Sequence, residues 1–405
     1  MFIKNGNVNN NLMMYVWLSL YYVYFVLSMS PWFSWSDEVK FLNYFLSIFI
    51  FLFTLVLLLG KHRYNKDDLN IFALLFILII WTFLPIREND SLKITIILQL
   101  SIISFILQSN VVKFKVIRLF YNYYSAANIL FIFLWVLYFL GVPSPDIIIA
   151  NGDRDNSNFY YKFYYGVVFL NSQTVNVGSL DFFRNHGFFE EPGHLGIFNL
   201  LFLCVFRNKT SELKYKICVL STVLTFSLPA LVGLGVLLIS SKAIKLKTKL
   251  SFILIVVSFI FIFSQQLLAI YSSTIGYKLE RGNTIQEVLD SRTMDLNRLP
   301  DARVVDVIIG FGREVFVKHN IVVGDYRSIL YKYGLLYYVF LLLIIYYIGS
   351  KRGFDLDFMC FFIVTLIILI QRSWFLDTSA YILFLCIFYI IGTNLKLNGS
   401  AKNGV

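Results

Sequence analysis

The run ICVLSTVLTFSLPALVGLGVLLIS, residues 217–240, decides the topology of this chain. It holds no charged residue and is long enough to cross about 30 Å of hydrocarbon as one helix. Its midpoint, Ser227-Leu228-Pro229, also allows the chain to turn back on itself. The run is therefore either one membrane span or a tight hairpin of two short spans.

The positive charges on either side of this run favour the hairpin. Short cytoplasmic loops of membrane proteins collect Lys and Arg. With Lys4 inside, the basic clusters at 61–66, 113–118 and 207–216 also fall inside. A single span would place the next cluster, at 242–249, outside, whereas a hairpin keeps it inside together with the basic residues near 351 and 396–402. Each arm is short, so we expect tilt or a partly re-entrant path.

Ten further apolar runs occur along the chain. They lie at roughly 12–30, 41–60, 69–86, 92–109, 119–142, 194–206, 250–268, 328–348, 357–371 and 379–394. The first has no small-residue cleavage site after it, and we interpret it as a span and not as a signal peptide. With the hairpin, the sequence predicts an all-α polytopic integral membrane protein of about twelve transmembrane helices. Both termini are expected to be cytoplasmic, in one domain over residues 1–405.

The composition agrees with this class. Hydrophobic residues make up 58% of the 405 positions and charged residues only 15%, against about 25% charged in soluble domains. The net charge of +11 is explained by the basic inside loops, so we expect no nucleic-acid partner. The four cysteines lie in or beside apolar runs, without metal-ligand or disulfide spacing, and we expect no metal or cofactor.

Two outside loops are long, at 143–193 and 269–326, and they differ from the inside loops in their basic residues. They hold seven Arg against three Lys, whereas the inside segments are rich in Lys. Topology needs only positive charge, but planar bidentate recognition of phosphate or carboxylate needs arginine. The bias predicts an anion-binding site on the outer face. The alternative is that these arginines pair with the acids of the same loops.

The densest polar cluster is the run Arg184 to His194, immediately before the sixth span. It offers an arginine, the carboxylates of Glu190 and Glu191, and the imidazoles of His186 and His194. Such a set allows anion binding and proton transfer together. The alternative is an interfacial cap that anchors the span, since Pro192 suits the first turn of a helix.

The second long loop is expected to be ordered. Thr284 and Glu287 have the spacing of a capping box, which predicts a helix to about Asn297. The apolar residues 303–309 are expected to be extended. They end at Gly310-Phe311-Gly312, where two glycines allow a tight turn and close approach of the backbone to a ligand.

Three motifs resemble those of the bacterial O-antigen and capsule polymerases and the related O-antigen ligases. The first is Arg184-x-x-Gly187-x-Phe189-x-Glu191-Pro192 at the start of a span. The second is Gly310-Phe311-Gly312, followed by Asp325 and by Gly334 in the next span. The third is Thr225-Phe226-Ser227, although Leu228 stands where the family often has Arg.

The resemblance implies transfer of a glycan from a polyprenyl-pyrophosphate carrier to a sugar hydroxyl at the outer face of the plasma membrane. Arg184, Arg281 and Arg292 would bind the pyrophosphate, and Glu191 or His186 would be the base. Further substrate-binding candidates are Arg313, His194, His319, Asp325, Gly187 and Gly312. The partners implied are the lipid-linked oligosaccharide, membrane lipid, a chain-length regulator and other polysaccharide-assembly proteins.

Three other functions stay open. Ligases of this family usually carry His-Asn about eleven residues before the glycine of the following span, whereas His319-Asn320 precedes Gly334 by fifteen, which favours a polymerase. A lipid-linked oligosaccharide flippase or transporter also has about twelve spans. Transporters usually hold charge within the spans, whereas here Lys332 is the main exception. A non-catalytic assembly protein is the third alternative.

Overall fold

The structure is a computed structural model, and it is mostly helical. It describes residues 15–24, 26, 37–59, 65–82, 95–143, 147–150, 160–170, 174–177, 180–240, 304–318, 326–372, 375–376 and 378–402. The expected helix at 284–297 and the apolar run at 250–268 lie outside these residues.

In every other apolar run predicted from the sequence, the described residues are almost all helical. Residues 15–24 are helical. The long helices that follow are α3 (Asp37–Leu59), α4 (Lys66–Thr82), α5 (Thr95–Ser104) with the short η1 (Phe105–Leu107), and α6 (Asn110–Phe139). The later ones are α7 (Pro192–Val205), α8 (Leu213–Leu224), α9 (Leu228–Ser240), α16 (Tyr326–Arg352), α17 (Leu356–Arg372) and α18 (Ser379–Lys402). Two of them, α6 and α16, are long and apolar enough to cross a membrane.

The chain forms two compact units. Unit 1 takes residues 1–28, 33–121 and 292–405, and unit 2 takes residues 29–32 and 122–291. The division falls within α6. The prediction of one membrane domain stays a prediction.

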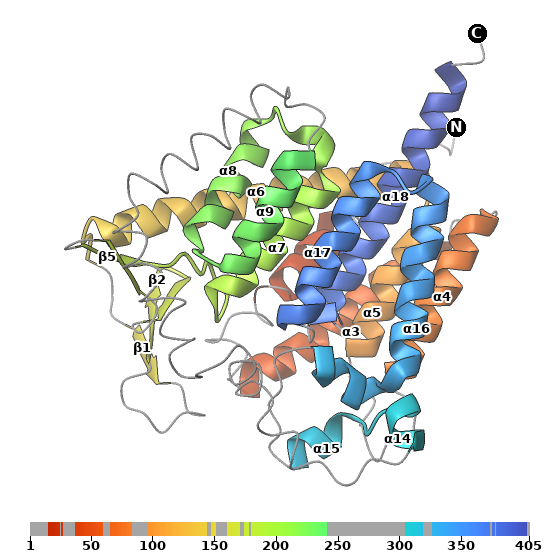
Figure 1. The fold of residues 1–405 in the computed structure, drawn as a ribbon, viewed down its shortest axis with the longest axis horizontal. Coiled ribbons are helices and arrows are strands. Elements are labelled where there is room, and N and C mark those ends of the chain that lie inside the picture. The colour runs from red at the N-terminus through yellow and green to blue at the C-terminus, as the bar shows by residue number, and fades with distance from the viewer. Residues whose placement is uncertain are drawn as a thin grey trace. The chain divides into compact units, whose positions relative to one another are not determined.

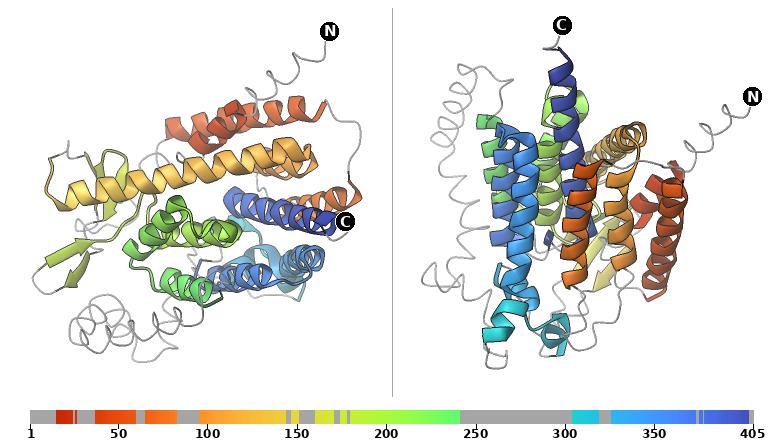
Figure 2. Two further views of the ribbon diagram at one scale, coloured as in Figure 1. Left: turned by 90° about the horizontal axis from the view of Figure 1, so that it is seen from above. Right: turned by 90° about the vertical axis from the view of Figure 1, so that its right-hand side faces the viewer.

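In unit 1, the helices pack side by side. Helix α16 contacts α4, α17 and α18, and α5 lies against α3, α4 and α18 (Figures 1 and 2). The interior of the unit is mostly aliphatic and aromatic, with a smaller number of buried polar and charged side chains. The outward faces are also apolar: α3 exposes Phe41, Phe49 and Leu52, and α16 exposes Leu335, Leu342 and Leu343.

In unit 2, the ambiguous run 217–240 is two helices, as the charge argument predicted. Helices α8 and α9 are separated by a turn at residues 225–227, where Phe226 has a positive φ of 45°. Arg207, after α7, donates a hydrogen bond to the carbonyl of Ser240 at the end of α9. The two positions are therefore at the same end of the unit, which one continuous helix over 217–240 would not allow.

The two arms of the hairpin are short. At about 1.5 Å per residue, the 12 residues of α8 and the 13 of α9 rise about 18–20 Å, less than the roughly 30 Å of a hydrocarbon core. The second part of α6 runs across α7, α8 and α9 and not parallel to them (Figure 1).

The expectation of an all-α fold is wrong in the first long loop. Residues 143–193 contain five short strands, β1 (Ile147–Ala150), β2 (Tyr160–Tyr164), β3 (Val167–Leu170), β4 (Thr174–Val177) and β5 (Leu180–Phe183). They form an antiparallel sheet of order β1-β2-β3 and a separate pair β4-β5. The turn Tyr165-Gly166 joins β2 to β3, and both of its residues have positive φ. Local hairpin pairing thus satisfies backbone groups of these strands.

The expectation of an extended segment at 303–309 is also wrong. Residues Val304–Ile309 form the short helix α14, followed by α15 (Arg313–Lys318). The β-branched residues favour a strand by propensity, but the packing of α14 against α16 overrides that preference. Helix α16 is itself broken at Gly334, whose φ of 75° and ψ of 176° are not helical.

Candidate functional site

The structure brings part of the predicted site together. Arg184, His186, Gly187 and Glu191 lie in unit 2, in the loop between β5 and α7, and His194 lies in the first turn of α7. Gly312 and Arg313 lie in unit 1, between α14 and α15 and at the start of α15. The remaining candidates Arg281, Arg292, His319 and Asp325 fall outside the described residues.

Arg184 binds the tip of the α8–α9 hairpin. Its Nε donates to the Thr225 carbonyl at 2.8 Å, and its Nη2 donates to the Phe226 carbonyl at 3.1 Å. The next residue continues this contact, since the main-chain N–H of Asn185 donates to the Leu224 carbonyl at 2.9 Å. The last carbonyls of a helix lack intrahelical donors, and Arg184 supplies them here. At least two nitrogens of its guanidinium group therefore make hydrogen bonds to the main chain of the hairpin.

A buried polar network continues from Asn185 into unit 2. Its side-chain oxygen accepts from the Gly187 N–H at 3.0 Å, and its Nδ2 approaches the Ser221 hydroxyl at 3.5 Å. Ser221 also accepts from Asn199 at 3.2 Å, and Asn199 accepts from the Tyr124 hydroxyl at 2.8 Å. Asn185, Asn199 and Ser221 have no exposed surface. These bonds fix the turn against α6, α7 and α8, because buried polar groups are costly unless paired.

Gly187 has a packing role. Its φ is 57°, and a Cβ atom there would lie 2.9 Å from ring carbons of Phe131. Its carbonyl accepts from the N–H of Val168 in β3 at 2.7 Å, which ties the turn to the sheet. A side chain at position 187 would be strained both by the dihedral and by the aromatic ring.

His186 is buried and neutral. Its exposed fraction is 1%, and its Nδ1 lies 3.2 Å from the Glu190 carbonyl, which can only accept, so Nδ1 carries the proton. Nε2 is then an acceptor, and it finds no hydrogen-bond donor among the described residues. Burial, assisted by the charge of Arg184, lowers the pKa of His186 to about 3. The imidazole is consequently uncharged at neutral pH.

Glu191 stands at the N-cap position of α7. Its backbone is extended, Pro192 follows as the first helical residue, and its carbonyl accepts from the His194 N–H at 3.0 Å. The Glu191 carboxylate does not cap the helix, and it is half-buried, whereas His194 is 8% exposed. The sequence correctly predicted that the helix begins at Pro192. A carboxylate here faces the positive end of the helix dipole.

Gly312 contacts the chain's own backbone. Its N–H donates to the Lys332 carbonyl at 3.0 Å, and the Phe311 N–H donates to the Tyr331 carbonyl at 2.7 Å. A third carbonyl next to the break, that of Tyr333, accepts from the indole of Trp81 at 2.9 Å. The glycine turn thus donates hydrogen bonds to carbonyls that the break at Gly334 leaves without helical partners. The sequence predicted a close approach of this backbone to a ligand, and the structure shows a close approach to α16.

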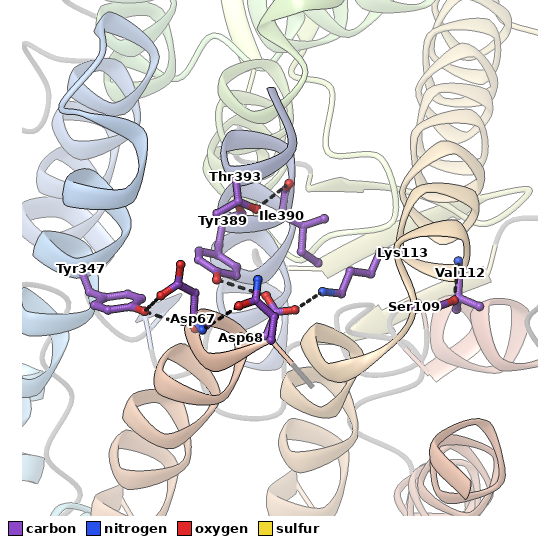
Figure 3. A network of polar contacts seen from close by, with 10 residues as sticks. Asp67, Asp68, Ser109, Val112, Lys113, Tyr347, Tyr389, Ile390 and Thr393 are labelled. Atoms are coloured by element: carbon purple, nitrogen blue, oxygen red, sulfur yellow. Dashed lines mark hydrogen bonds and ion pairs between the residues drawn. The ribbon is translucent and has the colours of Figure 1, made fainter. Parts of the chain in front are cut away.

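A second polar cluster in unit 1 was not predicted. Asp68 pairs with Lys113 at 2.7 Å and accepts from the Tyr389 hydroxyl at 3.1 Å (Figure 3). Its neighbour Asp67 pairs with Lys351 at 2.7 Å and contacts Tyr347. The partners of the two aspartates come from α6, α16 and α18, which explains why no local sequence pattern signalled the cluster.

No group of three metal-binding side chains occurs among the described residues. Comparisons with family models, with curated proteins and with solved structures found no match to this chain.

Proposed function

We propose that the chain is a multispanning protein of the bacterial plasma membrane, with both termini cytoplasmic. Large apolar side chains on the outer faces of α3 and α16 support this, because a soluble protein rarely exposes such surfaces. Helix α6 has 30 residues, about 45 Å, which allows a strongly tilted crossing.

The aspartate cluster supports the proposed topology. The charge argument puts the start of α4, the start of α6 and the end of α16 on the cytoplasmic side. In unit 1, Asp68 pairs with Lys113 (Figure 3) and Asp67 pairs with Lys351, and these four residues come from those three ends. The contact between Arg207 and Ser240 likewise joins two positions of unit 2 that the topology puts inside.

Within this class, the proposed activity is that of an O-antigen or capsule-type polysaccharide polymerase. The main support is that the run resembling the polymerase signature, Arg184 to Pro192, folds as one loop that Arg184 fixes to the α8–α9 hairpin. At the end of this loop, the Glu191 carboxylate makes no capping hydrogen bond to α7. Because α8 and α9 are shorter than the hydrocarbon core, the hairpin tip would lie below the outer surface, near the pyrophosphate of a membrane-embedded carrier.

The reaction joins two repeat units. The sugar hydroxyl of the acceptor attacks the anomeric carbon of the donor glycan, the bond from that carbon to the pyrophosphate oxygen breaks, and polyprenyl pyrophosphate leaves with the electron pair. A carboxylate takes the hydroxyl proton. Glu191 fits this role better than His186, which is 1% exposed and has its pKa lowered to about 3.

In this proposal, Arg281 and Arg292 stabilise the negative charge of the leaving pyrophosphate, and Arg184 is a further contact. Arginines that meet charge developing in the transition state contribute most when they are held in place beforehand. Two guanidinium nitrogens of Arg184 already bind main-chain carbonyls, so this residue positions the turn as well.

The test is elongation by the purified chain in detergent. Polyprenyl-pyrophosphate-linked repeat units are supplied, and a product ladder and released polyprenyl pyrophosphate are measured. Glu191→Gln should abolish both at an unchanged melting temperature, while the matched control Glu190→Gln should retain them. Arg281→Ala and Arg292→Ala should each reduce them. Full activity of Glu191→Gln would remove Glu191 from the mechanism, and full activity of both arginine variants would remove the pyrophosphate assignment.

A transporter of lipid-linked oligosaccharide is the second candidate, favoured by the break in α16. Helices interrupted at glycine commonly form substrate sites in transporters. Here the carbonyls beside the break are engaged by Phe311, Gly312 and Trp81. Absence of both ladder and pyrophosphate release, from folded protein given its own repeat unit, would favour the transporter. Transfer of one glycan block without a ladder would favour a ligase.

A further inference from the structure

Helix α14 exposes an unusual amount of apolar side chain for a segment of an outside loop. Val304 is 76% exposed, Val305 57%, and Val307 and Ile308 40% each. All four are β-branched and lie within one short helix, Val304–Ile309. Its single charged residue is Asp306, which is half-buried.

The position of α14 is fixed by the backbone of α16. A Cβ atom on Gly310 would lie 2.5 Å from the Gly334 nitrogen and 2.5 Å from the Lys332 carbonyl oxygen, so the two segments touch through main chain. The N–H groups of Phe311 and Gly312 bond to α16 at the same place. Helix α14 is therefore held beside the break.

The length of α16 gives the depth of this break. Residues 335–352 follow it, carry no charge before Lys351 and Arg352, and rise about 27 Å. The hydrocarbon core is about 30 Å thick. With the two basic residues at the cytoplasmic boundary, Gly334 lies at the opposite boundary.

Aromatic residues mark the same level. Trp81 donates to the Tyr333 carbonyl, and Tyr326, Tyr331 and Tyr338 lie on the same part of α16. Trp and Tyr gather where hydrocarbon meets the headgroups. The exposed aliphatic surface of α16 begins at Leu335, next to the contact with α14.

We propose that α14 is inserted in the outer leaflet, with Val304, Val305, Val307 and Ile308 in contact with lipid acyl chains next to the headgroups. Asp306 keeps the helix at the boundary and out of the hydrocarbon centre. Lipid is the occupant because the face is uniformly aliphatic and lies at the level of the aromatic residues. The inference rests on the proposed membrane location and not on the proposed enzymatic activity.

The test measures the surroundings of single labels on the full chain in phosphatidylcholine–phosphatidylglycerol vesicles. The four native cysteines are buried, so a cysteine introduced as Val307→Cys can be labelled selectively with an environment-sensitive fluorophore. Leu342→Cys, exposed in the middle of α16, is the lipid control, and Lys318→Cys, exposed on α15, is the aqueous control. Val304→Cys repeats the measurement if Val307→Cys does not fold.

Phosphatidylcholine carrying a nitroxide near the headgroup should quench the label at 307 several-fold more than the label at 318, and aqueous iodide should do the reverse. Iodide quenching at 307 equal to that at 318 would overturn the inference while leaving the membrane location intact. Protection at 307 from both quenchers would also overturn it, by indicating a protein contact. Phosphatidylcholine with a nitroxide deep in its acyl chain should quench the label at 342, and failure of that quenching would overturn the membrane location and this inference together.

Discussion

Asp68 and Lys113 form a buried ion pair, with 2.7 Å between the carboxylate and ammonium groups and side-chain exposures of 12% and 3%. Removing one partner leaves the other charge buried and unpaired. Asp68→Asn or Lys113→Met should therefore lower the free energy of unfolding by about 3–5 kcal/mol. The double variant Asp68→Leu with Lys113→Met should recover much of that loss, as measured by denaturant unfolding in detergent.

The exposed pair Lys209–Glu212 is the matched control. Its atoms are also close, at 2.6 Å, but its side chains are 45% and 37% exposed. Lys209→Met should change stability by at most about 1 kcal/mol. Equal losses at the buried and exposed pairs would show that burial of Asp68 and Lys113 does not matter.

Gly310→Ala should destabilise unit 1. Its φ is +90°, and a Cβ atom there would meet the backbone of Lys332 and Gly334 at 2.5 Å. Gly166 has a similar φ of +94°, with nothing within 4 Å of a Cβ atom. Gly166→Ala should then cost only the conformational strain, about 1–2 kcal/mol, while Gly310→Ala adds about 1–3 kcal/mol from overpacking. Similar melting temperatures for the two variants would contradict the backbone contact between Gly310 and α16.

Gly196 and Gly235 should respond in opposite ways to alanine. A Cβ atom on Gly196 in α7 would lie 2.6 Å from that of Ala230 in α9, whereas Gly235 has nothing within 4 Å. Gly235→Ala should stabilise the protein by about 0.5–1 kcal/mol through helix propensity. Gly196→Ala should destabilise it by about 1–3 kcal/mol because the two helices must separate. Thermal unfolding in detergent compares them, and a stabilising Gly196→Ala would rule out close packing of α7 on α9.

His186 should make stability depend on acid pH. Its folded pKa of about 3 lies below the unfolded value of about 6.5. Below pH 6.5 the His186 imidazole is protonated in the unfolded chain but stays neutral in the folded chain until the pH nears 3. The contribution of this residue is therefore complete above the unfolded pKa and is lost as the pH falls toward 3, by at most about 1.4 kcal/mol per pH unit. The difference between wild type and His186→Gln, measured by denaturant unfolding from pH 7 to pH 4, isolates this effect. An unchanged difference would mean that His186 is not buried as a neutral group.

The helices could be predicted because a helix forms its backbone hydrogen bonds within one segment, so each long apolar run can be read by itself. The division of 217–240 followed from the charges that flank it and from Ser227-Leu228-Pro229 at its centre. The start of α7 followed from Pro192, whose missing N–H is harmless in a first turn.

The strands of the first long loop were missed although a local signal exists. Tyr165-Gly166 separates two runs of aromatic and β-branched residues, Tyr160–Tyr164 and Val167–Leu170, which is the pattern of a β-hairpin. Helix α14 had no such signal, because its β-branched residues favour a strand and only the contact with α16 makes it a helix.

The candidate site was predicted as a set of residues but not as a set of contacts. The type and order of Arg184, His186 and Glu191 suggested chemistry, whereas the structural tasks of Arg184 and Gly187 depend on partners 41 and 56 positions away. The cluster of Asp67 and Asp68 was missed for the same reason, since Tyr389 is 321 positions from Asp68.

The bond between Arg184 and the hairpin tip has a consequence for biogenesis. Arg184 precedes Thr225 by 41 positions, so the ribosome releases the arginine before the carbonyls that it binds. In the proposed topology, the loop has already been translocated when α8 and α9 insert. A hairpin that inserted the other way round would place the Thr225 and Phe226 carbonyls on the opposite side of the bilayer from Arg184. In the proposed topology, only one orientation of the inserted hairpin would therefore allow this bond to form.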